Sequence, residues 1–588
     1  MASLLFSGCG QSSDQARIPT IDRLALVTDA DLVVHCSDTA AFAAALEHSP
    51  LGRLWNSPEM QATREGQSLE DLLRLALIDA ADGENAAQIN DIYMEQIKML
   101  SGEFILGLNF NDLGAAPAFT TVAAISEADF NRSLEMDKLL NALENEETIS
   151  ASEDFRDTRI YTYIKKQAAG DRFHYQAFYN GTLVMSENRP WLEQALIQLM
   201  DAPVKEPGGP PLLTVNGKAR LMDRIQGQLA QKIGESETPF DLTALISGLG
   251  FDTLGDIRMQ VGMQTDRIDM TLEIDRRGEW DHGLMVLMPP DPVPVDFRLA
   301  YVPPDVASYQ VTRLDLNALW QQIPEILRQI SPEFQMQFSL GLNAVGGMMD
   351  ININDDFFNN LDTLAFSFDR FGDQGQEMIY GLNVRNSDAM ERTLRKLFAE
   401  HSPLAARIHP FYRETDIQGH TIHMLQFPVP ADDGENTIIH EVGLTVVDRA
   451  LVIGNGSLVV DYVQAAVNNQ SPPAFYKSRP FRDMVARVPA EACSYAVSDL
   501  SAYVRFLADE IRTAAARTSA HQASPANADE DCGCEEEHDP LFAFFRNIEI
   551  ANLPSSDVMA SYFSTSDGYN MIDAAGFRAA MTIHYPEP

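Results

Sequence analysis

The sequence is poor in cysteine and in basic residues, and it contains no long apolar run. Its 588 residues include 5 cysteines, too few for a disulfide scaffold of this size. Lysine and arginine together number 43 against 85 acidic residues, which gives a formal net charge of -42. A surface with this charge repels nucleic-acid phosphates, so we expect no nucleic-acid partner. Because no apolar run is long enough to span a bilayer, we expect contact with a membrane only through a lipid anchor.

The motifs of several enzyme classes are also missing. The chain has no G-x-x-x-x-G-K-[ST] phosphate loop, no G-x-S-x-G nucleophile elbow and no H-E-x-x-H zinc motif. His420 and His423 lie three apart on a predicted strand, so they point to opposite faces and cannot chelate one ion together. We therefore expect a protein that is not an enzyme and needs no cofactor. A hydrolase whose residues meet only in space is an alternative.

What the sequence does contain is a long-period repeat. Residues 383–394 correspond to residues 124–134, residues 444–453 correspond to residues 176–185, and an amphipathic helix follows each copy. A repeat of this length indicates a duplicated architecture. Each copy reads strand, helix, strands, helix, which favours a sheet with helices on it. The predicted fold class is α+β, with two tandem homologous halves, each a mainly antiparallel sheet with helices packed on one face.

The repeat and the composition together divide the chain into segments. Residues 289–295 form a proline-rich run, which favours an extended connector. Residues 518–540 are polar, acidic and rich in alanine and serine, which favours a solvated loop. The predicted segments are an N-terminal tether at 1–20, a first half at 21–288, the connector at 289–295, and a second half at 296–588 with the acidic loop inserted at 518–540.

A strand followed by a helix recurs at several points of the repeat. Asp38, Asp315 and Asp499 fall near the predicted helix starts. A carboxylate at that position caps free N–H groups and complements the helix dipole. We therefore predict a structural role for these three residues.

Each half also ends in a similar pattern. In the first half, residues 252–261 and 267–274 are predicted to form a hairpin. Its expected counterpart consists of residues 553–562, 569–574 and 580–584.

One loop has the residue types of a metal site. Cys532, Cys534 and His538 lie close together in the acidic insertion, and two thiols with an imidazole could bind Zn²⁺. The spacing is not the usual C-x₂-C, and no fourth ligand is identifiable, so free thiols or an oxidised pair are alternatives. Cys36 and Cys493 lie in apolar, strand-like runs, which predicts buried inert thiols.

The N-terminus resembles the end of a bacterial lipoprotein signal. Leu4-Leu5-Phe6-Ser7-Gly8 precedes Cys9, and small residues stand directly before this cysteine. The resemblance implies lipidation of Cys9, with the polar residues that follow acting as a tether. The charged and apolar regions of a complete signal do not precede it. The alternative is an ordinary N-terminus with a stray cysteine.

Two segments near the N-terminus carry a family resemblance. Val34-His35-Cys36-Ser37-Asp38 leads into a helix, and Ser49-Pro50-Leu51-Gly52-Arg53-Leu54 follows it. The pattern resembles an uncharacterised family of exported bacterial proteins known as a domain of unknown function. The resemblance implies export and a location in the periplasm or on the outer membrane, and it brings no catalytic residues.

These observations favour a non-enzymatic, lipid-anchored protein of the cell envelope that acts as a binding or structural module for an envelope protein. The alternative is a periplasmic carrier of an apolar ligand such as a lipid. The 23 methionines and 30 phenylalanines suit a carrier, although such residues more often form ordinary core.

Overall fold

The structure is a computed structural model of the 588-residue chain. It describes residues 23–586 with gaps at 28, 64–91, 93–94, 97, 101, 111–117, 145–146, 166–171, 202–211, 235–245, 373–374, 400–410, 431–436, 469–472 and 523–552.

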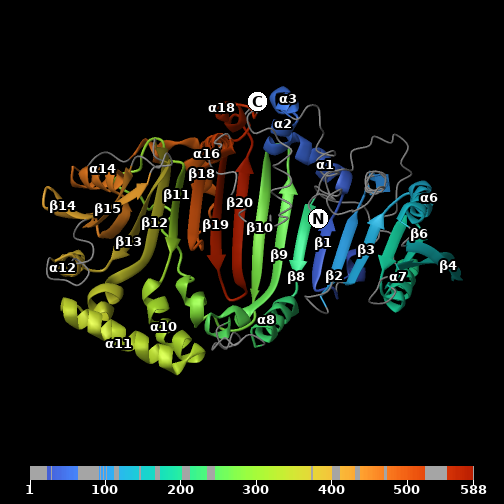
Figure 1. Ribbon diagram of the computed structural model, residues 1–588, viewed down its shortest axis with the longest axis horizontal. Helices are drawn as coiled ribbons and strands as arrows, with labels where there is room; N and C mark the ends of the chain where they lie inside the picture. Colours follow the sequence, from blue (N-terminus) through green and yellow to red (C-terminus); the bar gives the residue numbers. More distant parts are fainter. Residues whose placement is uncertain are drawn as a thin grey trace.

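The twenty strands of the described residues belong to one antiparallel sheet that runs the length of the molecule (Figure 1). The strands of the N-terminal part are β1 (Leu32–Cys36), β2 (Phe104–Asn109), β3 (Ala118–Ala124), β4 (Glu147–Phe155), β5 (Thr158–Lys165), β6 (Arg172–Tyr179), β7 (Thr182–Ser186), β8 (Leu212–Gly217), β9 (Leu254–Met263) and β10 (Arg267–Arg276). Those of the C-terminal part are β11 (Ser308–Arg313), β12 (Leu361–Gly372), β13 (Gly375–Val384), β14 (Tyr412–Ile417), β15 (His420–Pro430), β16 (Thr437–Val447), β17 (Ala450–Asn455), β18 (Ser494–Asp499), β19 (Thr565–Ile572) and β20 (Gly576–His584).

The two parts meet where β10 pairs with β20, from Arg267 opposite His584 to Asp275 opposite Gly576. Outward from this pair, the N-terminal strands follow the order β10-β9-β8-β1-β2-β3-β7-β6-β5-β4. The C-terminal strands follow the order β20-β19-β18-β11-β12-β13-β17-β16-β15-β14. The strand order is therefore the same in both directions from the junction. The mixed α and β class with a large antiparallel sheet is confirmed.

Local chemistry also recurs at equivalent places. The β6–β7 turn has positive φ at Asn180 and Gly181, and the β16–β17 turn has positive φ at Asp448 and Arg449. Two consecutive residues with positive φ match the twist of a tight hairpin. The three aspartates predicted as caps accept hydrogen bonds from backbone N–H groups at the starts of three helices, so that prediction is confirmed: Asp38 from Ala41, Asp315 from Ala318, and Asp499 from Ser501.

Helices lie on both faces of the sheet, so the prediction that they pack on one face is wrong. The N-terminal part contains η2 (Arg23–Val27), α1 (Thr39–His48), α2 (Pro50–Trp55), α3 (Pro58–Thr63), α6 (Glu127–Glu144), α7 (Arg189–Asp201), α8 (Ala219–Gly234), η3 (Phe251–Thr253) and η4 (Gly283–Leu287). The C-terminal part contains α10 (Leu316–Ile330), α11 (Pro332–Met349), η5 (Ile353–Phe357), η6 (Phe358–Asn360), α12 (Ser387–Leu397), α14 (Gly456–Val467), η8 (Ala474–Lys477), α15 (Arg479–Arg487), α16 (Leu500–Gln522) and α18 (Ser556–Ala560).

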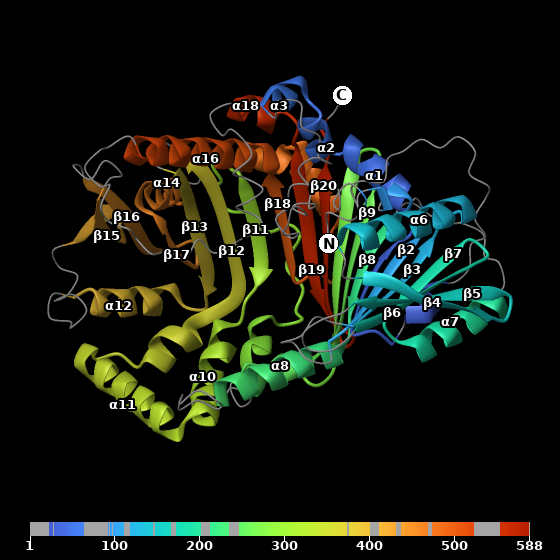
Figure 2. The ribbon, with the colours of Figure 1, turned by 45° about the vertical axis from the view of Figure 1, so that its right-hand side comes forward.

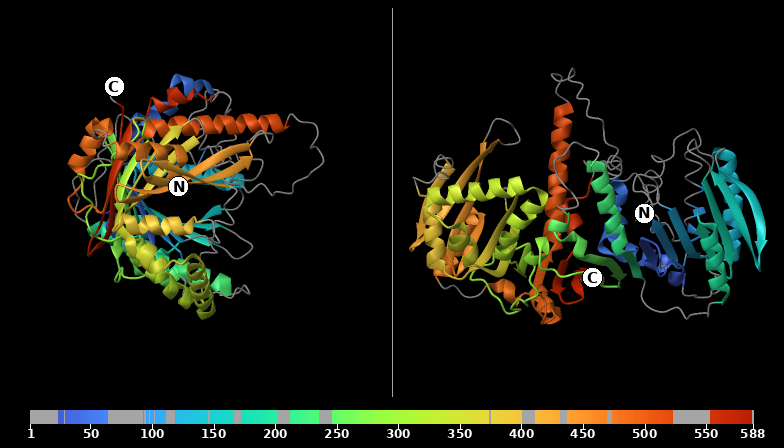
Figure 3. Two further views of the ribbon diagram at one scale, coloured as in Figure 1. Left: turned by 90° about the vertical axis from the view of Figure 1, so that its left-hand side faces the viewer. Right: turned by 90° about the horizontal axis from the view of Figure 1, so that it is seen from below.

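The outer strands are apolar on both faces, which is why helices cover both. On the first face, α7 and α14 bury side chains such as Leu192 and Tyr462 against the sheet. On the second face, α6 and α12 bury side chains such as Phe130 and Met390. The helices α8 and α16 project from the second face beside the central strands (Figures 2 and 3).

Three predicted segments differ from the structure or lie outside it. Residues 553–562, expected as a strand, contain the helix α18, because Ser555 caps it by accepting a hydrogen bond from the N–H of Val558. The strands β19 and β20 instead take the hairpin positions. The helix α16 runs to Gln522, into the segment predicted as a loop, and its Ala-rich sequence favours the helix. Most of the acidic insertion and all of the tether at 1–20 lie outside the described residues.

The proline-rich connector packs into the C-terminal part. Val293 is buried in the core cluster that also contains Tyr309 and Phe366. Its backbone N–H donates to Ala492 O at 2.8 Å. This valine therefore belongs to a folded core.

Candidate functional site

The central strands β9, β10 and β20 carry apolar side chains on one face of the sheet. Directly paired residues in an antiparallel sheet share a face, and successive residues alternate between faces. The pairing of Met270 with both Met581 and Val261 therefore places these three side chains together. We call the following set the central apolar face: Ile257, Met259, Val261, Met263, Ile268, Met270, Leu272, Ile274, Phe577, Ala579, Met581 and Ile583.

Most of the central apolar face is incompletely buried. Of its twelve side chains, only Met263 is buried, and it joins the second-face cluster with Phe42 of α1. Met259 and Met581 are 37% and 38% exposed. The set therefore lies on the same side of the sheet as α1, α8 and α16. No core cluster among the described residues includes Met270 or Leu272.

The opposite side of the same strands is polar. Arg258 contacts Asp275 at 2.8 Å and Glu273 at 3.3 Å, and Thr582 Oγ1 donates to Asp269 Oδ1 at 3.0 Å. These groups are partly exposed and stay hydrated. The central strands are thus amphipathic, with water on one side and an apolar surface on the other.

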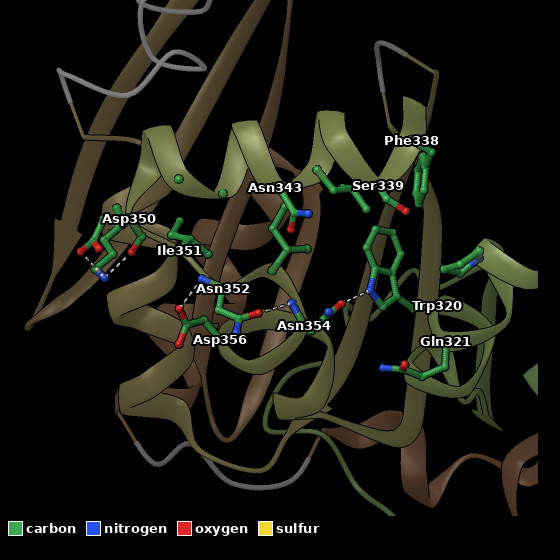
Figure 4. A pocket seen from close by; sticks show the side chains of 16 residues that line it. Trp320, Gln321, Phe338, Ser339, Asn343, Asp350, Ile351, Asn352, Asn354 and Asp356 are labelled. Carbon is green, nitrogen blue, oxygen red and sulfur yellow. Dashed lines mark hydrogen bonds and ion pairs between the residues drawn. The ribbon is translucent and has the colours of Figure 1, made fainter. Parts of the chain in front are cut away.

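A separate cavity of about 780 Å³ lies where α10 and α11 diverge (Figure 4). Trp320 and Phe338 contribute apolar surface, and Asn343, Asn352 and Asp356 contribute polar groups. The volume lies in the range of small-molecule sites.

The polar groups of this cavity are mostly bonded to one another. Trp320 Nε1–H donates to Asn354 Oδ1 at 2.6 Å, and the backbone N–H of Asn352 donates to Asp356 Oδ2 at 2.8 Å (Figure 4). Lys396 Nζ donates to Asp350 O at 2.6 Å. Trp320 also stacks on Phe358 at 4.0 Å between ring centroids, so one face of the indole is covered. These bonds fix the turn that follows α11.

The predicted site residues are placed as follows. Cys9, Cys532, Cys534 and His538 lie outside the described residues. Within the part of the chain that the structure describes, no group of three or more His, Cys, Asp and Glu side chains could hold a metal ion.

The two cysteines predicted as inert thiols are buried and free of disulfides. Burial raises the pKa of the Cys36 thiol to about 11. The thiol is therefore protonated at neutral pH, and a protonated thiol is a poor nucleophile. This agrees with the prediction for Cys36.

The histidine pair is likewise structural. His423 is buried and stacks on Phe398 with 4.6 Å between ring centroids, while His420 is half-buried. His423 Nδ1 lies 2.7 Å from Tyr412 Oη. Burial lowers the pKa of His423, and burial together with the bond to Glu414 raises the pKa of Tyr412 above its usual range. A neutral imidazole against a neutral phenol is a stable core contact.

The central apolar face was not identified from the sequence as a site, although part of its signal was visible. Residues 257–263 and 268–274 alternate strictly between apolar and other side chains, which indicates a strand pair with one apolar face. The third strand, β20, cannot be placed beside them by spacing, because Asp269 and Thr582 are 313 positions apart.

Among the described residues, none of the helices is long and apolar enough to cross a membrane. No family model matches the chain, and no curated protein matches it. Two solved structures are similar over part of it. Crystal form IV of TP0453 is 12% identical, covers 44% of this chain and 81% of its own, and has a TM-score of 0.21. Crystal form I of TP0453 is 11% identical, covers 44% and 79%, and has a TM-score of 0.20. Scores this low support no conclusion about fold or function.

Proposed function

We propose that the protein is a non-enzymatic binding module that holds the acyl chains of a lipid against the central apolar face. The observation that carries this proposal is that three adjacent strands present twelve apolar side chains on a single side. A contiguous apolar surface that the rest of the protein leaves incompletely buried is typical of an interaction site.

The chemistry of the face favours an acyl chain over a protein. Protein interfaces carry about one hydrogen bond per 100–200 Å². The strands β9, β10 and β20 are each paired on both sides, so their backbone groups are already used in the ladders. The face therefore offers few hydrogen bonds, which suits a partner with none to make. Four of its twelve side chains are methionines, whose flexibility adapts to a mobile chain.

The test compares two glutamates placed one residue apart. Met259→Glu puts a carboxylate on the central apolar face, whereas Gln260→Glu puts the same charge on the polar side. The measured quantity is the dissociation constant of cis-parinaric acid, a fluorescent fatty acid. Because burying an ionised carboxylate beside an acyl chain is costly, we expect Met259→Glu to weaken binding at least about tenfold. We expect Gln260→Glu to leave it unchanged.

A second measurement identifies the natural occupant. Organic extraction of the purified protein followed by mass spectrometry should release a lipid in stoichiometric amount. Absence of lipid together with equal probe binding by the two variants would contradict the proposal. A protein captured in place of lipid would favour the envelope-partner hypothesis.

We also propose that the protein is exported and anchored through a lipid on Cys9, which would place it in the bacterial periplasm or on the outer membrane. The support is the residue pattern before Cys9 and the acidic composition. Metabolic labelling with radioactive palmitate tests this proposal. Loss of label in the Cys9→Ala protein is the expected result, and an unlabelled native protein would overturn it.

The two tandem parts are proposed to be homologous halves of a duplicated unit. The common strand order outward from β10 and β20 supports this proposal, as do the hairpin turns at Asn180 and Asp448. Superposition of β1–β10 on β11–β20 in a crystal structure is the test.

A further inference from the structure

The helix α11 is apolar on both of its sides. Its inner side contributes Phe338 and Leu342 to the cavity shared with α10. Its outer side faces solvent, and five large apolar side chains there are between 40% and 63% exposed. These residues are Phe334, Met336, Leu340, Val345 and Met348.

This helix carries one charged side chain, Glu333 in its first turn. Between Phe334 and Met349 there is no Asp, Glu, Lys or Arg. The exposed polar side chains in that stretch are the uncharged Gln337 and Asn343. The helix has 18 residues and is therefore about 27 Å long. It lies at the lower rim of the molecule, beside α10 (Figures 1 and 2). A flat surface can approach it there.

The charge of the chain narrows the choice of partner. A formal net charge of -42 opposes approach to a second copy or to an anionic membrane. An uncharged bilayer does not repel the protein. Helices that lie in the membrane interface bury an apolar face into the boundary between headgroups and acyl chains. The outer side of α11 offers such a face without the lysines and arginines that would favour anionic lipids.

We propose that α11 docks the protein onto the surface of an uncharged lipid bilayer, with the helix axis in the membrane plane and its outer side buried. The docking is distinct from the proposed lipid anchor and from acyl-chain binding on the central apolar face. It would bring the protein to the surface from which a lipid is taken.

The experiment measures flotation of the full chain with phosphatidylcholine vesicles, using Cys9→Ala protein so that no anchor contributes. Leu340→Glu should lower the vesicle-bound fraction at least about fivefold. The matched control is Leu507→Glu on α16, because Leu507 is 59% exposed and Leu340 is 63% exposed. The control should float like the parent. Vesicles containing phosphatidylglycerol should bind less protein at low salt.

Three outcomes would overturn the proposal: no flotation of the parent, equal flotation of the two leucine variants, or a dimer that Leu340→Glu dissociates without any vesicle binding. Circular dichroism checks that the variants fold, and Met348→Glu provides a second substitution on the same side. Met259→Glu should float normally, so failure of acyl-chain binding and failure of docking are distinguishable.

Discussion

The buried carboxylate of Asp31 should hold α8 in place beside the central strands. Asp31 has no exposed surface and lies directly before β1. Its Oδ1 accepts a hydrogen bond from Arg220 Nε at 2.6 Å, and its Oδ2 contacts Arg224 and accepts from the N–H of Phe110 at 2.8 Å. Both arginines lie on α8. One carboxylate therefore connects this helix to the β1–β2 region.

The size of the expected loss of stability follows from the burial of the Asp31 carboxylate. Removing one partner of a fully buried ion pair costs about 3–5 kcal/mol. Arg220 and Arg224 are 45% and 38% exposed and can be hydrated by solvent after the loss, which reduces the cost. We therefore expect Asp31→Asn to lower the free energy of unfolding by about 2–3 kcal/mol. Asp31→Ala should cost more, because the N–H of Phe110 then lacks its acceptor.

Two assays check the result. Urea unfolding followed by circular dichroism measures the change in stability, and hydrogen exchange with mass spectrometry should show faster exchange in α8. The control is Glu325→Gln, which breaks an exposed pair with Arg328 and should have no measurable effect. Unchanged exchange in α8 with Asp31→Asn would refute the assigned role of this carboxylate. In a double-mutant cycle with Arg220→Ala, additive losses would show that the two groups are not coupled.

Three further predictions concern packing and ionisation. A Cβ at Gly381 would lie 2.0 Å from the ring of the buried Phe366. Gly381→Ala should therefore lower the free energy of unfolding by about 1–3 kcal/mol, measured by thermal unfolding. The control is Gly227→Ala, which should be neutral or stabilising because a Cβ there has nothing within 4 Å. Because burial lowers the pKa of His423 below its unfolded value near 6.5, the unfolded state binds the proton more readily, and stability should fall as pH drops below about 6.5. His423→Phe should reduce that slope, and an equal slope would contradict the assignment. At pH 8, iodoacetamide should leave Cys36 unmodified until the protein is unfolded, and rapid modification of the native protein, mapped by mass spectrometry, would show that the thiol is accessible.

Local sequence patterns predicted much of the fold. The aspartate caps at Asp38 and Asp315 could be foreseen because a cap acts on N–H groups only a few residues away. The β9–β10 hairpin could be foreseen because its strands alternate and lie close in sequence. Residues 553–562 were assigned to a strand because they are partly apolar, but Ser555 starts a short helix there.

The candidate site could not be predicted as a whole, because it is built by long-range pairing. Each of its strands shows one apolar face, and that is also the pattern of an ordinary core strand. The adjacency of β10 and β20 makes these faces continuous, and the helices on that side leave most of them incompletely buried. Neither property is encoded in local spacing. The exposed side of α11 was not predicted either, because an apolar helix has the sequence pattern of a buried one.

The junction between β10 and β20 has a consequence for synthesis. On the ribosome, β10 emerges long before β20, the final strand described. Until then, the N-terminal part would present a bare strand edge next to an apolar surface, and such edges recruit other chains. The nascent chain would therefore depend on chaperones that shield this edge. A stop codon anywhere before β20 would leave the edge without its partner permanently, so truncated products should aggregate rather than accumulate as soluble half-molecules.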